Sequence, residues 1–74
     1  MKYINIRSVG IICFPSFLNH RQMVEKLGYS TDIVASAGFV YISHNGPQCI
    51  GESFSLGIKA HKEDTGMLLG QMSL

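Results

Sequence analysis

The sequence predicts a small α+β domain: a mostly antiparallel sheet of three or four strands with two helices packed on one face, in the order β(β)-α-β-β-α. Three observations carry this prediction. Alternating apolar residues near the N-terminus and in mid-chain are typical of strands, two amphipathic segments are typical of helices, and Asn45-Gly46 marks a hairpin. Elements this few need one shared core, so residues 1–74 are expected to form a single domain.

The first strand region covers residues 2–14. Ile4 and Ile6 fall on one side of an extended chain and polar residues fall between them, which is the alternation of a half-buried strand. Gly10 interrupts the pattern, so the region forms either one long strand bent at Gly10 or two short strands. Pro15 ends it, because proline has no amide hydrogen to donate to a sheet.

The first helix has the clearest boundary signals in the chain. Asn19 is a preferred N-cap residue, and Gln22 stands three residues later, where its side chain can complete a capping box. We expect the helix to run to Leu27. It should stop at Gly28, because glycine tolerates the left-handed conformation found after a last helical turn.

A central hairpin organises the rest of the chain. Residues 29–37 are interpreted as a loop that leads into it, with a short helical turn capped by Ser30 as the alternative. The hairpin covers residues 38–58 and turns at Asn45-Gly46, where both residues are expected to adopt positive φ.

The second strand of this hairpin divides into a large face and a small face. The large face consists of Ile50, Phe54, Leu56 and Ile58. The small face consists of Cys49, Gly51, Ser53, Ser55 and Gly57. Because strand side chains alternate with a period of two, we expect the large face in the core and the small face in water or against another layer. Glu52 interrupts the large face and is expected to reach solvent.

The last helix is expected over residues 61–72. Glu63 and Asp64 fall in its first turn, where negative charge complements the helix dipole. Its apolar stripe consists of Thr65, Leu68, Leu69 and Met72. Gly66 and Gly70 each weaken the helix by about 1 kcal/mol relative to alanine, so tertiary contacts must hold it in place.

The composition is unusual in its low charge. Charged residues make up 15% of the chain and the net charge is +1, whereas an ordinary domain has about 25% charged residues. Either Ser, Asn, Gln and Gly cover the surface or a partner covers part of it. No apolar run approaches the roughly 18 residues of a membrane span, and nothing resembles a signal peptide. We therefore expect a cytoplasmic protein with reduced thiols at Cys13 and Cys49, of a size typical of small bacterial or phage proteins.

The sequence assigns no metal ligand, cofactor-binding residue or catalytic residue. The possible metal ligands are Cys13, Cys49, His20, His44 and His61. Their spacing matches no known ligand pattern. The segment from Gly51 to Ser55 also differs from a G-x-S-x-G nucleophile turn, because its fifth residue is serine. Enzyme activity is therefore not the favoured interpretation.

The favoured interpretation is a non-catalytic protein that acts by self-association or by binding another protein. The candidate interface residues are Tyr41, Cys49, Ser53 and Ser55. The first alternative is a cleft that binds a small ligand or catalyses a reaction, using His44, Cys49 and Glu52.

The second alternative is weak nucleic-acid binding through aromatic residues of an open sheet. Tyr3, Phe39 and Tyr41 are the residues that would stack on bases. However, the six basic residues are scattered and the five acidic residues nearly balance them. Nucleic-acid binders normally concentrate positive charge on one face, so this class is disfavoured.

Overall fold

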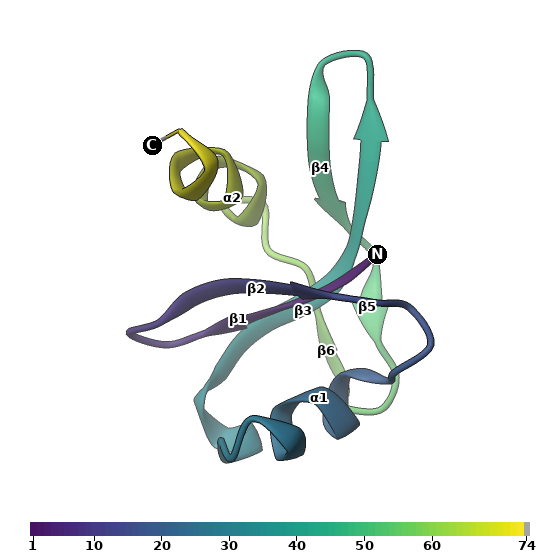
Figure 1. Ribbon diagram of the computed structural model, residues 1–74, viewed down its shortest axis with the longest axis vertical. Helices are drawn as coiled ribbons and strands as arrows, with labels where there is room; N and C mark the ends of the chain where they lie inside the picture. Colours follow the sequence, from purple (N-terminus) through teal and green to yellow (C-terminus); the bar gives the residue numbers. More distant parts are fainter. Residues whose placement is uncertain (74) are drawn as a thin grey trace.

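The computed structural model describes residues 1–73 and contains a four-stranded antiparallel sheet in the order β2-β1-β3-β4 (Figure 1). The strands are β1 (Lys2–Ile6), β2 (Gly10–Phe14), β3 (Val34–Ser43) and β4 (Gly46–Ile50). The other elements are helix α1 (His20–Lys26), the short 3₁₀ helix η1 (Thr31–Ile33), an antiparallel ribbon of β5 (Glu52–Ser53) and β6 (Ile58–Lys59), and helix α2 (Asp64–Met72). The α+β class and the antiparallel sheet are confirmed. Within residues 1–73, no helix is long and apolar enough to cross a membrane.

The elements near the N-terminus form where the local signals place them. Residues 2–14 are two strands, and Ser8 adopts a φ of 68° in the turn between them. The Asn19 side chain accepts a hydrogen bond from the Gln22 amide at 2.7 Å, and Gln22 Oε1 accepts one from the Asn19 amide at 2.9 Å. This is the predicted capping box. Gly28 follows the helix with a φ of 80°.

The segment before β3 forms the short helical turn that was the alternative to a loop. Ser30 caps the short helix η1 by accepting a hydrogen bond from the Asp32 amide. β3 then begins at Val34, four residues before the expected start of the hairpin at Gly38. Because of these extra residues, every residue of β1 has a pairing partner on β3.

The two helices lie on opposite faces of the sheet, so the prediction that both pack on one face is wrong (Figure 1). Ile4 and Ile6 pack with Val24 of α1. Tyr3 packs with Leu68 of α2 on the other side. β1 is an interior strand whose residues Tyr3–Ile6 are all buried, so each of its two faces needs a covering layer.

β3 and β4 extend past the start of β1 as an arm, defined here as residues 39–50 (Figure 1). The arm turns at His44 and Asn45, between the paired residues Ser43 and Gly46. Gly46 has a φ of 103°, but Asn45 does not have positive φ, contrary to the expectation for both residues. The single left-handed glycine closes the turn instead, as it does in hairpins that carry a glycine bulge.

The long second strand expected up to Ile58 is also wrong, because the chain bends at Gly51 and reverses after Ser53. Gly51 has a φ of 82°, which glycine adopts at little cost. Ser53 then anchors a turn: its Oγ accepts a hydrogen bond from the Leu56 amide, and its carbonyl accepts one from Gly57. These bends reset the alternation, so Ser53 is buried whereas Ile50 and Phe54 are exposed.

Candidate functional site

Exposure rises from Ala37 to Tyr41 along the α1 side of β3. Residues paired across an antiparallel sheet point to the same face, so Lys2, Phe39 and Ile50 form one row across β1, β3 and β4. Ala37, in the row below, is fully buried. Phe39 is 39% exposed and Tyr41, in the row beyond, is 57% exposed. Helix α1 therefore covers the base of this face and leaves the arm uncovered.

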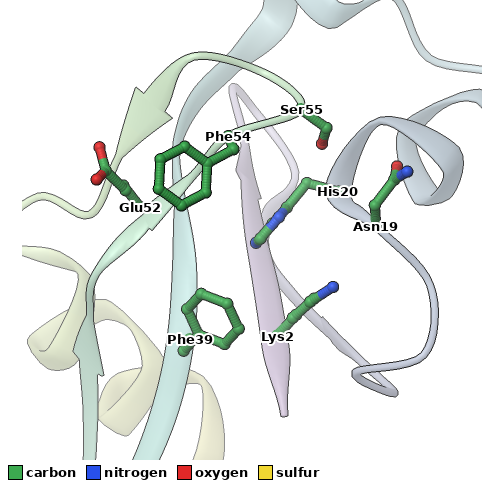
Figure 2. Close-up of a pocket in the computed structure, with 7 residues that line it drawn as sticks. All are labelled: Lys2, Asn19, His20, Phe39, Glu52, Phe54 and Ser55. Carbon is green, nitrogen blue, oxygen red and sulfur yellow. The ribbon is translucent and has the colours of Figure 1, made fainter.

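A pocket opens at the boundary between the covered and uncovered parts of this face (Figure 2). It has a volume of about 220 Å³. Its lining consists of Lys2, Asn19, His20, Phe39, Glu52, Phe54 and Ser55. Phe54 projects from the turn after β5 and is 90% exposed. We call Phe39, Tyr41, Ile50 and Phe54 together the arm face.

His20 forms a buried, neutral part of the pocket wall. Its ring stands edge-on between Phe14 and Phe39, with centroid distances of 5.5 and 5.8 Å. Its Nε2 lies 2.8 Å from the Gly38 carbonyl oxygen, and because a carbonyl only accepts, Nε2 carries the proton. Burial lowers the pKa of His20, an effect that the hydrogen bond to Gly38 opposes and the charge of Lys2 reinforces.

Two opposite charges stand on either side of the phenyl rings of the pocket (Figure 2). Lys2 Nζ donates to the Leu18 carbonyl at 2.8 Å and lies 5.9 Å from the centroid of the Phe39 ring. Glu52 is exposed, and its cross-strand neighbour is Lys59. Among residues 1–73 the one contact within ion-pair distance is between His61 Nδ1 and Glu63, at 3.7 Å, so Glu52 has no ion-pair partner there.

The opposite face of the sheet holds a buried polar cluster. Asp64, 1% exposed, accepts hydrogen bonds from Tyr3 Oη at 2.5 Å, from the His61 amide at 2.9 Å and from Asn5 Nδ2 at 3.3 Å. Asn5 Nδ2 also lies 3.2 Å from Ser36 Oγ. These contacts join β1, β3 and the start of α2.

The hydrogen bonds of this cluster keep Asp64 ionised. Burial raises the pKa of Asp64, but the donors Tyr3, His61 and Asn5 help to outweigh it, and the net pKa is lowered. Burial and the neighbouring carboxylate raise the pKa of Tyr3, which stays a hydrogen-bond donor. A carboxylate enclosed in this way has the character of a structural anchor for α2.

Helix α2 also makes hydrogen bonds to both edge strands of the sheet. Thr65 Oγ1 accepts a hydrogen bond from the outward-facing amide of Cys49 on β4, at 3.0 Å. Gln71 accepts from the Ile11 amide at 2.7 Å and donates to the Ile11 carbonyl at 3.0 Å on β2. The other outward-facing position of β4 is Pro47, which has no amide hydrogen. The β4 edge therefore offers no free donor to an added strand.

The structure separates the four predicted interface residues. Tyr41 is exposed on the arm, and Ser55 lies at the pocket, where its Oγ accepts a hydrogen bond from the Arg21 amide. Cys49 and Ser53 are 8% and 2% exposed, because β4 presents Cys49 to α2 and the turn encloses Ser53. Only Tyr41 and Ser55 therefore contribute to the surface.

The residues named for the two alternative functions lie in different places. His44 is in the turn at the tip of the arm, Cys49 is buried on the α2 side, and Glu52 lines the pocket on the α1 side. Burial raises the pKa of the Cys49 thiol, which disfavours the thiolate needed in a nucleophile. Of the three aromatic residues considered for stacking on bases, Tyr3 is completely buried.

The pocket was not predicted from the sequence, because the alternation of a single strand was assumed to continue through Phe54 and placed that residue in the core. The glycines at 51 and 57 flank this segment and were the available signal that the strand breaks on either side. Lys2 was assigned no role and Phe39 was named only for stacking on bases, since their meeting depends on the pairing of β1 with β3.

Comparison with protein-family models, with curated proteins and with solved structures finds no significant match for this chain. Within residues 1–73, no group of three or more His, Cys, Asp or Glu side chains is arranged to hold a metal ion.

Proposed function

We propose that this chain is a non-catalytic protein that acts through contact with another protein chain, and first of all by self-association through the arm face. The observation that carries this proposal is the exposure of four large apolar side chains that are neighbours along the sheet and the pocket. They are Phe39, Tyr41, Ile50 and Phe54. Apolar patches of this kind are uncommon on the free surface of a monomer and are typical of interaction sites.

Three further features support the proposal. Aromatic side chains contribute strongly to binding at protein interfaces, and three of the four residues are aromatic. Helix α2 bonds to both edge strands, and the β4 edge has no free donor, which favours contact through a face over strand addition at that edge. Cys13 and Cys49 are both free thiols, which supports the reducing environment of the cytoplasm.

The test is the mass in solution, measured by light scattering after size exclusion over a concentration series. We expect the wild-type chain to approach twice the monomer mass and Tyr41→Glu to shift it to the monomer, because the new charge would have to be desolvated in the contact. Leu69→Glu is the matched control, since Leu69 is an exposed apolar residue of α2 on the opposite side. A wild-type monomer at every concentration would remove self-association.

A further inference from the structure

The pocket beside the arm face has the size and lining to receive a phenyl ring. Its volume is about 220 Å³, and an engineered protein cavity of about 150 Å³ already binds benzene. Phe39 and the edge of His20 supply aromatic walls, and aromatic rings pack well edge-to-face. Phe54, at the rim and 90% exposed, is an apolar group that gains by being covered.

The charges around the pocket point to a particular occupant. Lys2 and Glu52 lie on opposite sides of the phenyl rings (Figure 2). An ammonium group has three donors, and Lys2 uses one of them on the Leu18 carbonyl. Glu52 has no ion-pair partner within residues 1–73, although Lys59 is its cross-strand neighbour. Each charge is therefore available to a group of opposite sign.

A surface with one positive and one negative group around an apolar centre is complementary to itself. In a two-fold symmetric dimer the same patch meets its copy, so each contact between two different residues occurs twice. We propose that the pocket binds Phe54 of a second copy of this chain, and that Lys2 of each protomer pairs with Glu52 of the other. This inference rests on the proposed self-association and names the residues that would make that association specific.

A free cationic ligand fits this pocket less well. Its aromatic rings and its carboxylate are features of cation sites. However, the Lys2 ammonium already lies 5.9 Å from the Phe39 ring and would repel a second cation. A second copy instead places a carboxylate near Lys2, which satisfies both charges.

Charge reversal tests the pairing directly. Lys2→Glu alone and Glu52→Lys alone each create two like-charge contacts per dimer, and we expect each to raise the dimer dissociation constant by about tenfold or more. In an equimolar mixture of the two variants, both contacts become attractive again. We therefore expect the mixture to form heterodimers, measured by native mass spectrometry, with close to wild-type affinity.

The controls separate a lost contact from a lost fold. Arg7→Glu makes the same charge change in the turn after β1, away from the pocket, and should leave the dissociation constant unchanged. Circular dichroism checks Lys2→Glu, which loses the bond to Leu18. Glu52→Lys and Phe54→Ala alter exposed side chains and carry the test independently.

The outcomes also separate this inference from the proposed function. A dimer that Tyr41→Glu dissociates but that both charge reversals and Phe54→Ala leave intact would overturn the pocket pairing and keep the arm face. A wild-type chain that is monomeric at every concentration would overturn both. Heterodimers in the mixture, with weak association of each variant alone, would establish the reciprocal pair.

Discussion

The two faces of the sheet treat polar and apolar side chains in opposite ways. On the α2 face, polar residues are buried: Tyr3, Asn5 and Asp64 lie at the centre of the molecule. On the α1 face, apolar residues of the arm stand in solvent, with Tyr41 the farthest from the body. The comparison shows that burial in this sheet depends on whether a helix covers the residue and whether its hydrogen bonds are satisfied, and not on polarity alone.

Burying polar groups and exposing apolar groups both cost free energy, and the two faces differ in how that cost is offset. A polar group can be buried when its hydrogen bonds are satisfied, and within residues 1–73 no buried side-chain nitrogen or oxygen lacks a partner. An exposed apolar group instead loses the stabilisation that burial would give. The polar cluster of the α2 face is thus complete within one chain, whereas the arm face gains by contact with a partner.

The largest expected effect comes from breaking the polar cluster. Asp64→Ala would leave Tyr3 Oη and the His61 amide without their acceptor and would remove one of the acceptors of Asn5 Nδ2. Leaving buried donors unsatisfied costs about 1–3 kcal/mol each, so we expect a loss of about 3 kcal/mol or more in the free energy of unfolding. Urea denaturation followed by circular dichroism measures it. Tyr41→Ala, on the arm face, is the control and should change the stability of the monomer little.

The pH dependence sharpens this prediction. The lowered pKa of Asp64 means that its stabilisation is fully present above 3.8, the unfolded value, and is lost as the pH falls through the lower folded value. The difference between wild type and Asp64→Ala should therefore shrink in acid below pH 3.8. A difference that stays constant there would show that the charge of Asp64 contributes nothing.

A second, smaller effect is expected at the junction of the two regions, where His20 supports the pocket. Because the folded pKa of His20 is lowered below 6.5, the unfolded chain binds a proton that the folded chain excludes, and stability falls as the pH drops through 6.5. His20→Gln keeps an N–H donor for the Gly38 carbonyl but cannot titrate. Its unfolding free energy should vary less than that of wild type between about pH 7 and pH 5. His44→Gln, in the arm turn, is the control and should keep the wild-type slope.

Local signals predicted a large part of the fold. The capping box of Asn19 and Gln22, the stop at Gly28 and a central hairpin all follow from neighbouring residues. The placement of the helices did not, because it depends on contacts between distant positions. Asp64 was expected only to complement the helix dipole from the first turn, but Tyr3, sixty-one positions away, makes it a buried anchor.

The candidate site was predictable only in part, for the same physical reason. Tyr41 was identified from the alternation of β3 and is exposed on the arm. Cys49 and Ser53 belong to the small face, which was expected either in water or against another layer, and helix α2 and the turn at 53–57 cover them. A period of two gives relative faces, and it does not say which face receives a helix.

The smallest expected effect is at the edge strand β2, where Gln71 of α2 makes hydrogen bonds to Ile11. Gln71→Ala removes the hydrogen bonds to the Ile11 amide and carbonyl, which lie at the surface of the sheet edge. We expect hydrogen exchange at the Ile11 amide to become about tenfold faster, with a loss of no more than about 1 kcal/mol in global stability. The Cys49 amide, held by Thr65 on the other edge, is the internal control and should exchange at the wild-type rate. Equal acceleration at both amides would mean that α2 opens as one unit, and then the two edges would be protected or exposed together.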